Sequence, residues 1–148
     1  MTKTPNTYIA PPKARKPYIG KICVTVSKKL PYFAEFIYDE KGILINGELV
    51  DTIRMEWLDG FLFKEYIEIN LNNKLALTSL AENFLKMCQD LRDNQISHGD
   101  LQEGNILVTK NGEIKLVDYD SICIPEIEEQ EEFVTGLKGY QHPSRFKD

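Results

Sequence analysis

Three polar residues arranged around a short hairpin constrain the fold of this chain more than any other feature. Asp100 lies in a His-Gly-Asp stretch, Asn105 follows five residues later, and Asp118 follows after another thirteen. Apolar runs at 106–108 and 114–117 predict two strands that join the last two of these residues. A β-hairpin of this kind can bring all three side chains together. Their oxygens suit a divalent metal and a phosphate held beside a hydroxyl group.

Helices are predicted on the N-terminal side of this loop. Ser79-Leu80-Ala81-Glu82 matches a capping box and predicts a helix that continues through Asp93. A shorter helix is predicted over 61–71. The apolar face of the longer helix is expected to carry Leu80, Phe84, Leu85, Met87, Cys88 and Leu91.

The first half of the chain reads as a small antiparallel sheet. Residues 33–38 predict a strand, and residues 39–42 predict a turn. Asn46-Gly47 between 43–45 and 48–50 is a strong signal for a hairpin, and 52–57 predicts a further strand. Asn111-Gly112 predicts the corresponding turn of the second hairpin.

The N-terminal residues are less informative. Residues 1–17 are basic and rich in proline, which predicts a flexible leader. In residues 18–30, Ile22, Val24 and Val26 alternate as in a strand. Ile19, Ile22, Cys23 and Val26 would equally form one face of a helix.

Composition excludes some classes of partner. The chain has 148 residues, of which 42% are hydrophobic and 28% charged, as in one globular domain or part of one. A formal net charge of -5 argues against nucleic acid and against an anionic membrane as partners. No apolar stretch is long enough to span a bilayer, and no secretory signal is evident. The three cysteines form neither a metal-ligand pattern nor a disulfide framework, so reduced thiols in a cytoplasmic protein are expected.

The order of these elements resembles the protein-kinase-like fold over roughly residues 31–145. In that family the catalytic loop reads H-R-D-x-x-x-x-N, and a D-F-G motif follows a hairpin. Here His98-Gly99-Asp100 with Asn105 corresponds to the first motif, and Asp118-Tyr119-Asp120 to the second. The resemblance implies an α+β fold with a remnant of the small antiparallel β lobe at 18–57. It also implies a hinge at 58–60 and the start of the helical lobe at 61–148.

Residue roles follow from this resemblance. Asp100 would accept or orient the proton of an attacking hydroxyl, while Asn105 and Asp118 would hold magnesium against the phosphates of ATP. Glu56, Trp57 and Leu58 would lie at the hinge, where backbone groups pair with adenine. Two alternatives remain open: Trp57 as a buried aromatic that closes the small sheet, and Asn105 as a loop residue that bonds only to backbone. His98 is expected to be a structural residue behind the loop.

The sequence departs from the family pattern in ways that bear on regulation and on the kind of kinase it resembles. Gly99 replaces the arginine that reads a phosphorylated activation loop, so control by that route is not expected. The H-G-D-L stretch is similar to small-molecule and atypical kinases such as the aminoglycoside phosphotransferases. Residues 136–143 resemble the G-Y-x-H-P stretch of bacterial kinase-like proteins.

The family's phosphate-covering G-x-G-x-x-G loop and lysine-bearing strand have no counterpart in the sequence. Residues 18–30 fall where the family has its αC helix, which favours the helical alternative there. We therefore expect a partial domain that begins midway through the small lobe. Its stability would be weak unless it associates with itself or with a partner chain that completes the lobe.

The resemblance implies an ATP- and magnesium-dependent phosphotransferase that transfers the γ-phosphate to a protein or small-molecule hydroxyl. The alternative is a non-catalytic, pseudokinase-like module that binds nucleotide or another protein. Loss of the lysine and the glycine loop would remove electrostatic stabilisation that this chemistry needs. A metal-assisted hydrolase is a third reading, but the sequence has no set of histidine ligands to support it.

Overall fold

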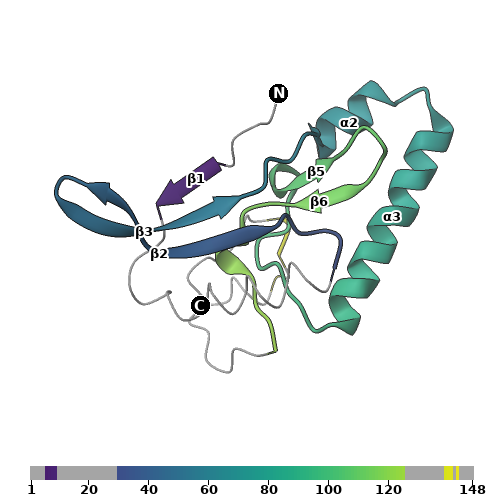
Figure 1. Ribbon diagram of the computed structural model, residues 1–148. Coiled ribbons are helices and arrows are strands. Elements are labelled where there is room, and N and C mark those ends of the chain that lie inside the picture. Colours follow the sequence, from purple (N-terminus) through teal and green to yellow (C-terminus); the bar gives the residue numbers. More distant parts are fainter. Residues whose placement is uncertain (1–5, 10–29, 126–138, 142, 144–148) are drawn as a thin grey trace. The chain divides into compact units, whose positions relative to one another are not determined.

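The computed structural model describes residues 6–9, 30–125, 139–141 and 143 (Figure 1). The chain divides into two compact units, Met1–Leu58 and Asp59–Asp148. The first unit contains an antiparallel sheet, and the second combines a smaller sheet with two helices. This mixture confirms the predicted α+β class.

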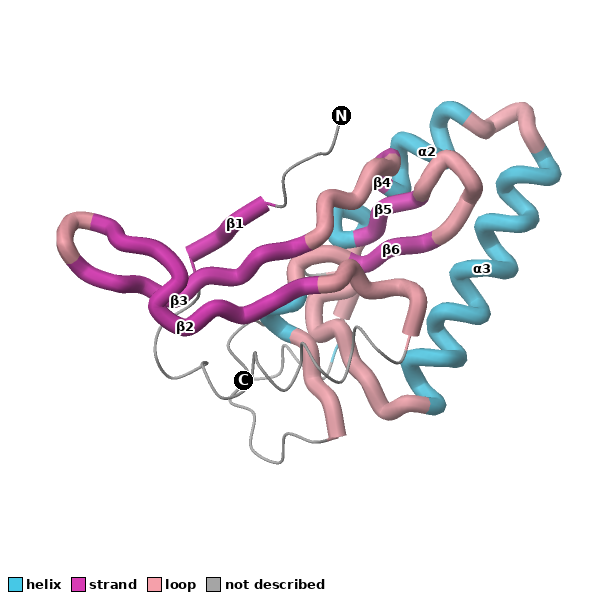
Figure 2. The backbone as a smooth tube through the Cα atoms, in the orientation of Figure 1, coloured by secondary structure: helices cyan, strands magenta, loops and turns pink. Residues whose placement is uncertain are grey.

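A long hairpin forms most of the sheet in the first unit. Strand β2 (Phe36–Ile45) pairs antiparallel with β3 (Glu48–Met55), as the two longest strands in Figure 2 show. Asn46 and Gly47 both have positive φ, 52° and 84°, as a tight two-residue turn that follows strand twist requires. The predicted Asn-Gly turn is therefore confirmed.

The turn predicted at 39–42 is wrong, because β2 continues through it as a bulge. The pairing register with β3 shifts between Asp39 and Ile43, so the extra residues leave the ladder without ending the strand. Asp51, which is buried, accepts hydrogen bonds from the Tyr38 hydroxyl (2.7 Å) and the Lys41 amide (2.8 Å). The Asp51 carboxylate thus supplies hydrogen-bond acceptors at the bulge, where the regular pairing of the two strands is interrupted. The two strands predicted at 48–50 and 52–57 form one continuous strand, β3, which ends at Met55.

The expected flexible leader includes residues that belong to this sheet. Strand β1 (Asn6–Ile9) pairs antiparallel with β3, which gives the order β1-β3-β2. For these four residues the expectation of a flexible leader is wrong. They are ordered by backbone hydrogen bonds to β3, and composition does not predict pairing with a strand so distant in the chain. The helix expected at 18–30 lies outside the described residues except for Leu30, which is in neither helix nor strand. The acidic run at 126–132 also lies outside them.

The second unit contains the hairpin that joins the polar residues. Strands β4 (Phe61–Leu62), β5 (Ile106–Val108) and β6 (Ile114–Leu116) form an antiparallel sheet in that order. Alternate residues of β5 and β6 point into the core, which confirms the predicted hairpin. These buried residues are Ile106, Val108, Ile114 and Leu116.

In the described part of the second unit, two α-helices accompany the sheet. Helix α2 (Phe63–Ile69) follows β4, and α3 (Lys74–Asp93) runs alongside the β5-β6 hairpin in Figure 2. The Asn83 side chain on α3 donates to the Gly112 carbonyl in the hairpin turn (3.1 Å). Leu80, Met87 and Leu91 are the buried residues of α3.

The start predicted for this helix is wrong. Helix α3 begins at Lys74, and the Asn73 side chain caps it by accepting a hydrogen bond from the Ala76 amide (3.2 Å). Ser79 lies within the helix. Leu85, predicted on the apolar face, is 68% exposed, because its direction turns away from the buried stripe.

Two expectations from composition concern membranes and thiols. Within the ranges that the structure describes, no helix is both long enough and apolar enough to cross a membrane. Cys88 and Cys123 are half-buried and form no disulfide, and burial raises the pKa of Cys88 against the opposing effect of Arg92. Cys23 lies outside the described residues.

Candidate functional site

Three segments of the second unit meet around the backbone of Val117. The His98 Nε2 atom lies 2.9 Å from the Val117 carbonyl oxygen, and the Val117 amide donates to the Asn105 carbonyl (3.0 Å). An antiparallel bridge between Ser97 and Cys123 continues this contact. The loop that carries Asp100, the start of β5 and the residue before Asp118 are therefore held together by hydrogen bonds.

Asn105 connects directly to Asp100. It ends the short helix η2 (Glu103–Asn105) and is buried. Its Nδ2 atom donates to the Asp100 carbonyl (2.8 Å) and to Asp100 Oδ2 (3.1 Å). The bond to backbone is the one that a plain loop residue would make, whereas the bond to the carboxylate fixes the side chain of Asp100 as well.

Gln102 is a second donor to this carboxylate, and the sequence did not predict it. Its Nε2 atom lies 3.2 Å from Asp100 Oδ2. Both amide donors therefore bind the same oxygen of the carboxylate. A polar residue two positions after an aspartate is too common a pattern to identify such a contact.

Asp118 lies at the other side of the cluster and is exposed. It precedes the short helix η3 (Tyr119–Ser121) and has φ 63° and ψ 77°, in the left-handed region. Aspartate tolerates this conformation better than most residues, although it remains uncommon. The Tyr119 hydroxyl donates to the Leu116 carbonyl (2.6 Å) and so fixes the backbone on both sides of Asp118.

His98 is a buried neutral residue. Burial lowers its pKa, although the Val117 carbonyl and the nearby carboxylates of Asp118 and Asp100 act in the opposite direction. Because a carbonyl can only accept, Nε2 carries the proton and donates to Val117. The Nδ1 atom is buried without a hydrogen-bond partner. The ring is therefore a support for the loop, as expected.

Gly99 is required by close packing of the backbone. Its φ is 77°, and a Cβ atom there would overlap the Ser121 backbone and side chain. Its carbonyl accepts a hydrogen bond from Gln141 Nε2 (2.9 Å). The position has no room for the arginine that many kinases carry, because η3 packs against it.

The predicted hinge residues belong to the first unit. Strand β3 ends at Met55, and the Glu56 amide donates to the Glu35 carbonyl (2.9 Å). Glu56 is exposed, Leu58 is half-buried, and the boundary between the two units follows Leu58. Trp57 is 46% exposed, so the alternative of a buried aromatic that closes the sheet is wrong.

The oxygen atoms near Val117 fit magnesium better than a metal that needs many protein ligands. With Nδ2 of Asn105 turned toward Asp100, its Oδ1 atom is the oxygen left to face a cation, and Asp118 supplies an exposed carboxylate. No cluster of three His, Cys, Asp or Glu residues suited to a metal occurs in the part of the chain that the structure describes. Mg²⁺ characteristically takes one or two protein oxygens and completes its shell with phosphates and water.

These elements define a kinase-like protein. A β-sheet unit ends at a short linker, and a second unit presents an H-G-D loop, an asparagine, a hairpin and an aspartate around one backbone position. The chain belongs to the ABC1 atypical kinase-like domain family, whose model matches residues 50–140.

Relatives with curated names agree with this family. "Probable serine/threonine-protein kinase mkcC" of Dictyostelium discoideum is 26% identical over 106 residues, which are 70% of this chain and 12% of that protein. "Serine/threonine-protein kinase PrkC" of Bacillus subtilis is 38% identical over 69 residues, 45% of this chain and 10% of that protein. "Probable serine/threonine-protein kinase mkcB" of Dictyostelium is 34% identical over 67 residues, 45% of this chain and 9% of that protein. The chain thus spans about a tenth of the length of these relatives.

Proposed function

We propose that this chain carries the catalytic loop of an ATP- and magnesium-dependent phosphotransferase that transfers the γ-phosphate to a hydroxyl group. The observation that carries the proposal is the hydrogen-bonded cluster around Val117, which connects the loop of Asp100 to Asn105 and Asp118. Membership in a kinase-like family supports the same reaction class.

In this proposal Asp100 orients the attacking hydroxyl and accepts its proton. Asn105 and Gln102 both donate to Asp100 Oδ2, and these two hydrogen bonds limit rotation of the carboxylate and so fix its orientation for the hydroxyl. Asn105 Oδ1 and the Asp118 carboxylate would hold magnesium, which when bound neutralises charge on the phosphates. Backbone groups of Glu56, Trp57 and Leu58 are the proposed contacts to adenine.

The acceptor that we propose is a protein serine or threonine. Three relatives carry the name of serine/threonine-protein kinases, and this favours a protein over a small-molecule hydroxyl. The proposed location is the cytoplasm, in keeping with the composition and the free thiols.

The test is magnesium-dependent turnover of ATP by the purified chain and by matched variants. Asp100→Ala should lower turnover by roughly 10²- to 10⁴-fold, the usual contribution of a positioned base. Asp118→Ala should raise the magnesium concentration needed for half-maximal rate. Asp93→Ala removes an exposed carboxylate at the end of α3 and should leave both quantities unchanged.

The same experiment separates the catalytic proposal from a non-catalytic, nucleotide-binding module. If turnover is measurable and the Asp100 and Asp118 variants match the parent chain, the assigned roles are wrong. If ATP with magnesium raises the melting temperature but no turnover occurs, the chain is a binding module.

A further inference from the structure

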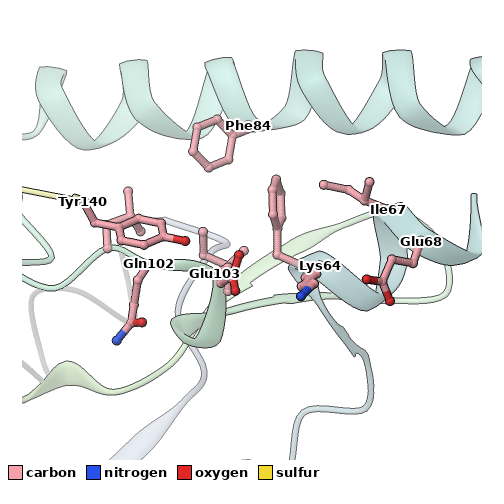
Figure 3. Close-up of a pocket in the computed structure, with 10 residues that line it drawn as sticks. Lys64, Ile67, Glu68, Phe84, Gln102, Glu103 and Tyr140 are labelled. Carbon is pink, nitrogen blue, oxygen red and sulfur yellow. The ribbon is translucent and has the colours of Figure 1, made fainter. Parts of the chain in front are cut away.

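A mostly apolar pocket lies directly beside the loop that carries Asp100. Its volume is about 490 Å³, within the range of ligand sites, and it is partly open to solvent. Figure 3 shows Phe84 pointing into this space from α3, with Ile67 of α2 at one side and Tyr140 at another. The apolar lining consists of Phe63, Ile67, Phe84, Leu101, Ile106 and Tyr140.

The pocket and the proposed base share one loop. Leu101 follows Asp100 in the chain and lines the pocket. Gln102 also lines it, and its amide donates to Asp100 Oδ2 (3.2 Å). A group bound in the pocket is therefore within one or two residues of Asp100, a reach that successive side chains of an extended peptide can cover.

The charged residues that line the pocket favour a ligand that carries a positive charge next to the group bound in the pocket. Lys64 and Glu68 are four residues apart on α2, and their opposite charges cancel. Glu103 therefore gives the lining a net negative charge. Partial burial, with the Glu103 carboxylate beside the hydroxyl, raises the pKa of Tyr140. Figure 3 shows this hydroxyl directed toward Glu103. Because the phenol stays neutral, the negative charge on the rim is that of Glu103.

We infer that this pocket selects the acceptor: it binds a large apolar side chain of a peptide, next to a Lys or Arg that faces Glu103, and thereby presents a nearby serine or threonine to Asp100. The inference rests on the proposed function, because it names the acceptor for that reaction. An open, apolar pocket with an acidic rim fits a side chain on a passing peptide, whereas sites for small molecules enclose most of their ligand.

The test uses synthetic nonapeptides with a central serine, one lysine and otherwise alanine, in which a single phenylalanine is moved from position to position. Binding is measured by fluorescence anisotropy without nucleotide, and phosphate transfer is measured separately. One phenylalanine position should improve binding about tenfold over the alanine peptide, the gain expected from burying such a side chain. Replacing the lysine by glutamate in that peptide should remove most of the gain.

Two variants connect this preference to the pocket. Tyr140→Ala removes one wall and should reduce the gain to about twofold or less, and Tyr140 is 47% exposed, so the fold should survive the change. Glu103→Gln should abolish the preference for lysine and keep the preference for phenylalanine. Leu85→Ala on the exposed side of α3 is the control and should change neither.

Failure of this inference and failure of the proposed function give different results. If every phenylalanine position binds like alanine, or if Tyr140→Ala retains the full gain, the pocket does not select the acceptor. This holds whether or not phosphate is transferred. If a small aromatic amine binds the pocket and the peptides show no preference, the inference is also overturned. A preference lost in the variants supports the inference, even if no phosphate is transferred and the proposed reaction is wrong.

Discussion

Asp100 and Asp118 differ in how firmly the fold holds them. Asp100 is half-buried and accepts hydrogen bonds from two side-chain amides, whereas Asp118 is exposed at the start of η3. A proton acceptor gains from a fixed orientation, since misplacement by a fraction of an ångström costs rate. A metal ligand in an open position can adjust as a phosphate-bound cation arrives. The two environments therefore agree with the roles proposed for these carboxylates.

His98 predicts a measurable pH dependence of stability. An unfolded histidine has a pKa near 6.5, and folding lowers the pKa of His98. The unfolded state therefore binds more protons below pH 6.5, so the free energy of unfolding should fall as the pH decreases, by up to about 1.4 kcal/mol per pH unit. Above that range both states are neutral at this position and the effect is absent.

Urea unfolding between pH 7.5 and 5 tests this prediction. His98→Gln keeps an amide that can donate to the Val117 carbonyl but cannot titrate, so its stability should decline less steeply with falling pH. An equally steep decline in the His98 variant would show that another group causes it.

At the level of elements, the helix that precedes the Asp100 loop begins at a cap that the sequence pattern did not identify. Asn73 ends the α2–α3 connection, and its side chain accepts a hydrogen bond from the third residue of the helix (3.2 Å). Ser79-Leu80-Ala81-Glu82 has the spacing of a capping box but lies one turn and more inside the helix. An interior match is possible because these residue types are also compatible with helix.

A pair of alanine substitutions tests where the helix begins. Asn73→Ala should lower the free energy of unfolding by about 1 kcal/mol, the usual cost of losing an N-cap. Ser79→Ala should be neutral or slightly stabilising, because alanine is the better residue inside a helix. Chemical denaturation of both variants measures the difference, and a larger loss for the Ser79 variant would place the cap at Ser79 after all.

At the scale of the whole molecule, the chain exposes large apolar residues that an isolated protein usually buries. Ile69 and Leu71 precede α3 and are each 65% exposed, and Leu75 in its first turn is 83% exposed. An exposed apolar group of this kind is typical of an interaction surface. Association with itself or with a partner chain, expected from the sequence because the small lobe is incomplete, stays a prediction, and these residues of the second unit are where we test it.

Self-association is tested by sedimentation velocity over a concentration series. The parent chain should show a sedimentation coefficient that rises with concentration, and Leu75→Gln should reduce this rise. Lys74→Gln introduces the same side chain at the neighbouring exposed position and removes no hydrophobic residue, so it should behave like the parent chain. A parent chain that remains monomeric throughout the series would contradict the prediction.

The sequence alone determined the features that depend on neighbouring residues. Both Asn-Gly turns, the β5-β6 hairpin and the α+β class were predicted correctly, because turn geometry and the alternation of buried residues are local properties. The spacing of Asp100, Asn105 and Asp118 was equally visible, since one hairpin separates the last two.

Only the tertiary structure decided the features that depend on residues distant in the chain. The bulge in β2 is stabilised by Asp51 from the opposite strand, and β1 exists through its pairing with β3. Gly99 cannot carry a side chain because Ser121 occupies the space, and Tyr140 lines one pocket with residues of the Asp100 loop, nearly forty residues away in the chain. Such contacts follow from packing and from backbone hydrogen bonds across the fold, which leave no periodic pattern in the sequence.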